Sequence, residues 1–307
     1  MKVEARSIGP IASQVLRRHS DATVIASFDH SFYLDADGHL ICVASESLYD
    51  GPFNILTRLP GHGAAWPSLP IAVGQRWTID DNALSCADDP GIDIDLSAAL
   101  AWCPKPPPRD LPNPSQIGLA VGNLRALAAS RCRRDGLLDL VLDQESKPNS
   151  AAARAAQKPL QDLSQHAMTW LGHGDRRIMA SLEALLGLGP GLTPSGDDLI
   201  AGLLIGCRYI GRDAGALDLW RTLEREAKTR TTPISMAHLS AAGQGMGAAP
   251  FHDLIDALIE NRTVHITEAL DAVARIGHSS GLDAVGGLLI LLDAWIAVGN
   301  AQAAPAA

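Results

Sequence analysis

A proline-rich segment, Cys103–Pro114, divides the sequence into two parts with different patterns. Proline fixes φ and lacks an N–H group, so this segment fits neither a helix interior nor a central strand. We therefore expect a linker at residues 103–115 between two domains. The chain has 307 residues, which is long enough for two hydrophobic cores.

The part before the linker, residues 1–102, has the pattern of short strands. β-Branched and aromatic residues run through Thr23–Tyr33 and Leu40–Ser45, and Asp35–Gly38 between them has the composition of a hairpin turn. Shorter candidates, separated by Gly and Pro, are Asn54–Leu59, Arg76–Ile79 and Ile92–Leu96. This pattern predicts a small β-barrel or β-sandwich.

After the linker, apolar residues follow helical spacing through residues 116–300. Aromatic residues make up only 4% of the chain, so the core volume must come from Leu, Ala, Ile and Val, which favours packed helices. The predicted fold class is α+β, a β-rich domain followed by a mostly helical domain, with a disordered tail at residues 301–307. The expected helices are Ile117–Cys132, Ala151–Leu171, Arg176–Leu188, Asp197–Ile210, Ala214–Lys228, Ser235–Met246, Phe251–Glu260, Thr263–Ile276 and Gly281–Val298.

The charge distribution argues against nucleic acid and membrane partners. The net charge is −9, and Arg131–Arg134 is the one short basic cluster. A nucleic-acid or anionic-membrane surface needs concentrated positive charge. The five cysteines lack metal-ligand spacing, which predicts reduced thiols and a cytoplasmic location. The first ten residues lack the apolar core of a signal peptide, and Asp283 and Asp293 within Gly281–Gly299 favour a buried core helix over a membrane span.

The segment Gly187–Asp198 (GLGPGLTPSGDD) is the strongest candidate for a functional site. Gly189 and Gly191 permit backbone geometries that bring N–H groups close to a ligand. Ser195 suits the N-cap of the following helix, whose free N–H groups and dipole favour a phosphate or carboxylate. Ser195-x-x-Asp198 is also a capping box, which would satisfy such N–H groups with no ligand at all.

A second copy of this helix start lies further along the chain. Ser195–Ile205 aligns without gaps on Ser280–Ile290, at a constant offset of 85 residues. Each copy begins with Ser-Gly-x-Asp, and Gly202 or Gly287 follows where another helix can pack closely. Both segments are apolar on nearly all sides, which predicts buried helices. Two interpretations are open: the helix starts converge on one pocket, or the copies form only a helix-packing repeat.

Three carboxylates at these helix starts are the candidate catalytic residues: Asp197, Asp198 and Asp283. Together they have the composition of a Mg²⁺ site, because Mg²⁺ binds a few carboxylates plus substrate phosphate oxygens. Alternatively, Asp198 and Asp283 only close their capping boxes, which leaves Asp197 as the better candidate for ligand or metal binding. No other cofactor is indicated. The candidate anion-binding residues are Gly189, Gly191, Thr193, Ser195, Gly196, Ser235, Ser279 and Ser280.

Other motifs are weaker. Thr232 or Ser235 is expected to cap a helix, and His238 falls within that helix, where a single histidine is more often structural than an acid or base. Gly61–Gly63 is a flexible turn containing one histidine. The sequence has no G-x-S-x-G elbow, no Walker A lysine and no Rossmann pattern after a strand, so the corresponding functions lack support.

These motifs resemble those of a bacterial family known mainly as a domain of unknown function, which includes the AllH-like subunit of oxamate carbamoyltransferase. The resemblance rests on Gly187–Asp198, Thr232–Ser235 and Ser279–Asp283, and it covers most of the chain after the linker and, more loosely, the β segment before it. It implies carbamoyl transfer, in which an N-carbamoyl compound such as oxalurate reacts with phosphate to give carbamoyl phosphate and oxamate. It also implies partner subunits.

Three functional hypotheses follow. The first is a cytosolic enzyme subunit that binds phosphate, carbamoyl phosphate or a small carbamoyl substrate, with Asp197 orienting the substrate. The second is a non-catalytic subunit that binds a small anion or serves in assembly. The third is a metal-dependent amidohydrolase that uses the three aspartates. The first hypothesis lacks one element, a cation beside the loop that would neutralise phosphate. The arginines nearest to the loop in sequence are Arg176, Arg177, Arg208 and Arg212.

Overall fold

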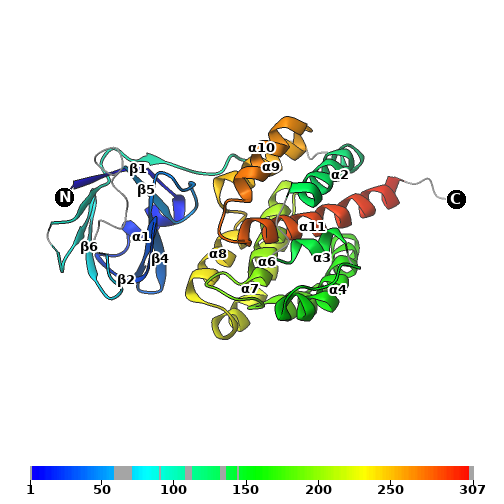
Figure 1. Ribbon diagram of the computed structural model, residues 1–307, viewed down its shortest axis with the longest axis horizontal. Coiled ribbons are helices and arrows are strands. Elements are labelled where there is room, and N and C mark those ends of the chain that lie inside the picture. The colour runs from blue at the N-terminus through cyan, green and yellow to red at the C-terminus, as the bar shows by residue number, and fades with distance from the viewer. Residues whose placement is uncertain are drawn as a thin grey trace. The chain divides into compact units, whose positions relative to one another are not determined.

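The computed structural model describes residues 2–58, 71–89, 91–107, 113–131, 136–143 and 145–303. The chain divides into two units, Met1–Lys105 and Pro106–Ala307, and each has a hydrophobic core of its own. Strands occupy the first unit and helices fill the second (Figure 1). The boundary between the units falls within the proline-rich segment.

The N-terminal unit is a closed β-barrel, so of the two predicted architectures the barrel is the one observed. Neighbouring strands follow the order β5-β4-β3-β2-β6-β7-β8-β1, pairing between β1 and β5 closes the ring, and β9 adds to β1. A short helix, α1 (Pro10–Leu16), follows β1. The strands are β1 (Lys2–Ile8), β2 (Asp21–Phe28), β3 (Ser31–Ala36), β4 (His39–Ser45), β5 (Asn54–Arg58), β6 (Arg76–Asp80), β7 (Ala83–Cys86), β8 (Asp93–Asp95) and β9 (Leu100–Ala101).

The predicted hairpin turn is present between β3 and β4. Asp37 and Gly38 both have positive φ, 52° and 81°, the geometry that matches the twist of paired strands. The segment Thr23–Tyr33, expected as one strand, forms parts of β2 and β3, which pair antiparallel across a tight turn. Strand β1 was not predicted, because its charged residues alternate with small buried ones such as Val3 and hide the apolar face.

The C-terminal unit is helical, as predicted. Three details differ from the sequence-based boundaries: α2 begins at Pro114, inside the expected linker; a short helix α3 lies between expected ones; and α11 continues to Ala303, into the expected tail. The helices are α2 (Pro114–Arg131), α3 (Leu138–Leu142), α4 (Ala151–His173), α5 (Ile178–Leu185), α6 (Ser195–Tyr209), α7 (Asp213–Arg230), α8 (Pro233–Gly243), α9 (Ala249–Ile259), α10 (Thr263–Val273) and α11 (Ser280–Ala303).

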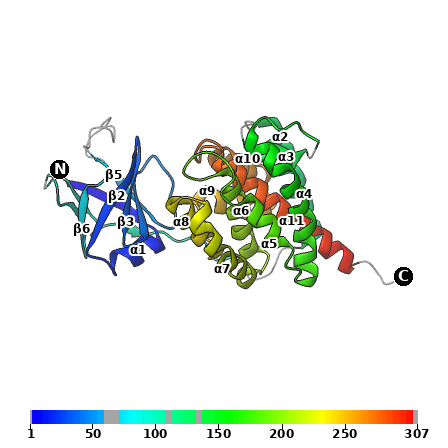
Figure 2. The ribbon, with the colours of Figure 1, turned by 90° about the horizontal axis from the view of Figure 1, so that it is seen from below.

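The two repeat helices, α6 and α11, lie side by side in the core of this unit (Figures 1 and 2). A Cβ atom on Gly202 would lie 1.9 Å from the carbonyl oxygen of Ala284, and one on Gly287 would lie 1.8 Å from that of Leu199. The glycines therefore permit the backbones to touch.

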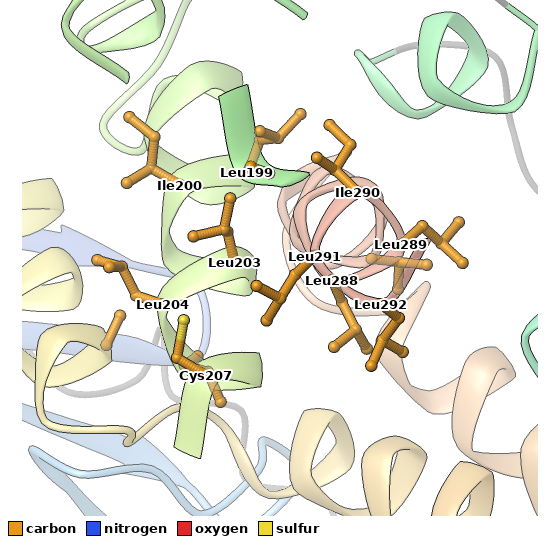
Figure 3. Packing of buried hydrophobic residues seen from close by; sticks show 14 of the residues in the cluster. Leu199, Ile200, Leu203, Leu204, Cys207, Leu288, Leu289, Ile290, Leu291 and Leu292 are labelled. Carbon is orange, nitrogen blue, oxygen red and sulfur yellow. The ribbon is translucent and has the colours of Figure 1, made fainter. Parts of the chain in front are cut away.

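Beyond these glycines, leucines fill the contact between α6 and α11. Leu203 of α6 and Leu291 of α11 point into the space between the helices (Figure 3). The stretch Ser280–Gln302 is long and apolar enough to cross a membrane, but 67% of its apolar window is buried inside the protein. This burial accounts for the apolar composition of α11.

Candidate functional site

A pocket with a volume of about 850 Å³ lies at the starts of α6 and α11. Four segments line it, and they come from distant parts of the sequence. Two of them are the loops that precede the repeat helices, so of the two interpretations that the sequence left open, the structure shows convergence of the helix starts on one pocket. The lining segments are Gly136–Leu137, Ser150–Ala152, Leu188–Thr193 together with Ser195, and Gly277–Ser280.

The glycine-rich loop has the backbone geometry that its sequence predicts. Gly189 and Gly191 adopt φ values of 127° and 94°, which other residues rarely adopt. The hydroxyl of Thr232 donates to the carbonyl of Leu192 at 2.5 Å and holds the loop to the start of α8. Across the pocket, the hydroxyl oxygens of Thr193 and Ser280 lie 3.0 Å apart and join the two loops.

The pocket wall offers hydrogen-bond donors from the backbone. In the described part of the chain, the N–H groups of Gly191, Leu192 and Thr193 have no protein acceptor, and neither have those of Ala151 and Ala152. The last two open the 23-residue helix α4, whose dipole is positive at this end. The hydroxyls of Thr193, Ser195, Ser279 and Ser280 add polar side chains to the wall.

The start of α6 differs from its prediction. Pro194, not Ser195, is the N-cap residue, and no side chain caps the helix. The N–H of Gly196 donates to the carbonyl of Leu188 at 2.8 Å, and those of Asp197 and Asp198 donate to Pro194. The expected capping box is therefore wrong, and the N–H groups of Gly196, Asp197 and Asp198 are not free for an anion.

Asp197 is a structural anchor. Its side chain is fully buried, and one carboxylate oxygen accepts the N–H of Gly187 at 2.6 Å. The other accepts the hydroxyls of Thr231 and Ser235, the latter at 2.6 Å. Both oxygens are occupied, which contradicts the expectation that Asp197 serves a ligand or a metal. It also takes Ser235 out of the anion-binding set, because that hydroxyl is committed to Asp197.

Asp198 and Asp283 are arranged differently. The hydroxyls of Ser280 and Thr193 lie beside the carboxyl of Asp198, and those of Ser195 and Ser279 lie beside that of Asp283. Ser195 and Ser280 thus each approach the aspartate of the opposite helix. One carboxylate oxygen of Asp283 also accepts the N–H of Leu137 at 2.6 Å. The second oxygen of each carboxyl, Oδ2, is buried without a partner in the described part of the chain.

Burial changes the protonation of these two carboxyls. Desolvation raises the pKa of Asp198 well above its ordinary range, and the negative charges of Asp283 and Asp197 raise it further, against hydrogen bonds from Ser280 and Thr193. Desolvation also raises the pKa of Asp283, against hydrogen bonds led by the N–H of Leu137. The surroundings of these two carboxyls therefore favour fewer than two negative charges.

Two family models match the chain. The family described as "Oxamate carbamoyltransferase subunit AllH" matches residues 185–292, and the family described as "AllH family N-terminal domain" matches residues 4–101. The chain belongs to the AllH family. No solved structure matches the chain. The AllH match spans both loops of the pocket, and the N-terminal match covers the barrel.

Several predicted residues of this AllH-family chain lie away from the pocket surface. Gly196 packs so closely on α5 that a Cβ atom would lie 1.9 Å from the carbonyl oxygen of Leu185. Within the described ranges, no three His, Cys, Asp or Glu side chains are grouped to hold a metal, so the three-carboxylate arrangement that the sequence left open for Mg²⁺ is not observed there. Burial lowers the pKa of His238 to about 4, and Gly61–Gly63 lies outside the described residues.

The arginines near the loop in sequence serve other contacts. Arg176 pairs with Asp218 at 2.8 Å, Arg177 pairs with Asp175 at 2.5 Å, and Arg212 donates to the carbonyl of Leu171. A fourth, Arg208, packs against Gly245. None of the four lines the pocket.

Sequence reasoning missed part of the pocket wall. Gly136 and Leu137 approach Asp283, where a Cβ atom on Gly136 would lie 2.2 Å from a carboxylate oxygen. Ser150 caps α4 by accepting the N–H of Ala153 at 3.0 Å. Its Ser-before-helix pattern was visible in the sequence, but nothing there indicated that α4 starts beside α6. His278 also lines the pocket and carries no local motif.

Proposed function

We propose that this chain is a carbamoyltransferase subunit that binds carbamoyl phosphate, or a related N-carbamoyl substrate, in the pocket at the starts of α6 and α11. One observation carries the proposal: backbone N–H groups without a protein acceptor among the described residues and a cluster of hydroxyls line a single pocket, and two of its four lining segments lie in the region that matches AllH. Backbone N–H groups suit oxyanions, and hydroxyls suit the carbamoyl group.

The chemistry of carbamoyl transfer requires this combination. Attack of a phosphate oxygen on a carbamoyl carbon gives a tetrahedral species with negative charge on oxygen. Fixed N–H donors stabilise that charge, and orientation of the two reactants supplies much of the rate enhancement. The N–H groups of Gly191 to Thr193 and of Ala151 and Ala152 are such donors. A hydroxyl such as that of Ser195 or Ser280 accepts from a carbamoyl N–H and donates to an oxygen.

The proposal also includes partner subunits and a cytoplasmic location. No Lys or Arg is among the described residues that line the pocket, and a phosphate is best bound with a neutralising cation. A partner subunit is a natural source of that cation. Arg133 and Arg134 also precede Gly136 in sequence, and both lie outside the described residues. With no concentrated basic surface in the sequence, we propose no nucleic acid or membrane partner.

Calorimetry tests the proposed binding. The titrants are carbamoyl phosphate, inorganic phosphate and oxalurate, each added to the wild type and to the double variant Thr193→Val with Ser195→Ala. We expect the variant to bind carbamoyl phosphate about 10-fold or more weakly, because two hydroxyl contacts are lost. The control is Thr267→Val, which removes a hydroxyl that bonds only within α10.

Three outcomes of this titration are informative. Weaker binding by the double variant alone supports the proposed site. Equal binding by wild type and double variant overturns it. Binding without any transfer, even with partner subunits present, favours the second hypothesis, a non-catalytic subunit that binds a small anion.

A further inference from the structure

A local two-fold relation connects the starts of α6 and α11, so that a contact made by one helix has a matching contact made by the other. Gly202 contacts Ala284, and Gly287 contacts Leu199, so each contact has a counterpart 85 residues away with the helices exchanged. Ser195 and Ser280 follow the same relation, because each approaches the aspartate of the opposite helix, and Thr193 and Ser279 add hydroxyls from the preceding loops. This arrangement gives two crossed pairs, Ser195 with Asp283 and Ser280 with Asp198.

The serines of the two pairs lie between the carboxyls and the pocket. Ser195 and Ser280 line the pocket, whereas the Oδ2 atoms of Asp198 and Asp283 are buried and have no partner among the described residues. A buried polar atom without a partner is costly, and such atoms are uncommon in native structures. The crossed pairs therefore form a polar connection from the pocket to two carboxyl groups.

The surroundings of the carboxyls determine how many protons they hold. The ionisable groups near Asp198 are Asp283 on α11 and Asp197 on α6, and the loop before α11 contributes His278 to the pocket wall. Among the described residues at the start of α3, Leu137 and Leu138 contribute backbone N–H groups to Asp283. Two neighbouring buried carboxylates do not both ionise readily, and no Lys or Arg is among the described residues that line the pocket, so the raised pKa values favour one shared proton on the pair.

We propose that Asp198 and Asp283 form one acid–base pair that exchanges protons with the substrate through the hydroxyls of Ser280 and Ser195. This inference rests on the proposed function and assigns its proton transfers. The serines touch the substrate, and the aspartates act through them as positioning residues. Because of the two-fold relation, the ionised carboxylate accepts a proton on one side of the pair, and the protonated carboxyl donates a proton on the other.

The transfer step balances with one proton held by the pair. An oxygen of hydrogen phosphate forms a bond to the carbamoyl carbon, and its O–H proton passes through one serine hydroxyl to the ionised carboxylate. The bond from the carbamoyl carbon to the leaving nitrogen then breaks. The protonated carboxyl passes its proton through the other serine to that nitrogen. The pair ends with one proton, as it began, and the reverse reaction exchanges the two roles.

Infrared spectroscopy of the full chain at pH 7 tests the pair without substrate. We expect the wild type and the control Asp253→Asn to show the C=O band of a protonated buried carboxyl. The double variant Asp198→Asn with Asp283→Asn should lose this band. Absence of the band in the wild type, or its persistence in the double variant, overturns the inference. A purely structural pair of ionised carboxylates would give no such band.

Turnover separates this inference from the proposed function. We expect Asp198→Asn and Asp283→Asn to bind carbamoyl phosphate within about 3-fold of wild type, while transfer with partner subunits slows by about 10²–10⁴-fold, the usual size of acid–base catalysis. The control Glu268→Gln, on the exposed face of α10, should alter neither. Unchanged turnover in both variants overturns the inference alone. Failure of the wild type to bind any carbamoyl compound overturns the proposed function.

Discussion

Asp197 and Asp198 are adjacent in sequence but occupy opposite electrostatic environments. Asp197 accepts hydrogen bonds from Gly187, Thr231 and Ser235, which hold the loop, the end of α7 and the start of α8 together. Asp198 has a buried oxygen with no partner in the described part of the chain, and a raised pKa. Neighbouring residues of a helix point in different directions. Asp197 points toward hydrogen-bond donors, and Asp198 points toward a second carboxyl.

Substitution of these two residues separates their roles. We expect Asp197→Asn to lower the free energy of unfolding by about 2–4 kcal/mol, because an amide N–H₂ would face groups that are themselves donors. Asp198→Asn should not lower it at pH 7, because it removes a poorly solvated charge. Urea denaturation of both variants measures the difference. Equal destabilisation would contradict the assigned roles.

The raised pKa of Asp198 also predicts a pH dependence of stability. An aspartate has a pKa near 3.9 in the unfolded chain. Because the folded value is higher, the folded state binds more protons, and stability is lost as the pH rises from about 4 through the folded pKa. Asp198→Asn should therefore gain melting temperature relative to wild type as the pH increases. A difference that stays constant from pH 4 to pH 8 would contradict the shift.

At the scale of elements, the contact between α6 and α11 positions the site. The two helices approach closely because Gly202 and Gly287 lack Cβ atoms where the partner backbone passes. Their starts therefore come together, and the loops before them form two walls of the pocket. The two copies of the sequence repeat thus pack against each other, and the loops before them line one shared pocket.

A glycine substitution tests this contact. Gly202→Ala would place a Cβ atom 1.9 Å from the carbonyl oxygen of Ala284, so the helices must separate. We expect a loss of more than about 3 kcal/mol in the free energy of unfolding, together with weaker ligand binding.

The matched control for this substitution is Gly122→Ala on the exposed face of α2, where a Cβ atom would meet nothing within 4 Å. It should increase stability by about 0.5–1 kcal/mol. Denaturation curves of both variants give the comparison. Similar effects at the two positions would show that the α6–α11 contact tolerates a side chain.

At the scale of the whole molecule, the chain has two cores built on different principles. The barrel core gathers alternate residues of its strands, with Phe32 and Trp77 in ring contact at 5.2 Å. The helical core gathers mainly Leu, Ala and Ile around α6 and α11. Among the described residues, the two cores share no member.

Separate cores predict separate responses to core mutations. Trp77 is fully buried, and we expect Trp77→Ala to destabilise the barrel by about 3–5 kcal/mol. Gly202→Ala should instead destabilise the helical unit. Scanning calorimetry of the full chain then shows a different part of the unfolding transition shifted in each variant. One common transition that shifts as a whole in both would show that the units unfold together.

The sequence by itself determined the succession of a β unit and a helical unit, because side-chain periodicity and proline content are local properties. It also located the two Ser-Gly-x-Asp helix starts, since a constant spacing can be read without coordinates. The direction of each side chain was decided only by the tertiary structure. The serines lie beside the aspartates of the opposite helix, and Asp283 accepts the N–H of Leu137, which is 146 residues away. Asp197 accepts the N–H of Gly187, which is 10 residues away, because packing brings these groups together. Local sequence describes which hydrogen bonds a helix start can make, and packing selects which of them it makes.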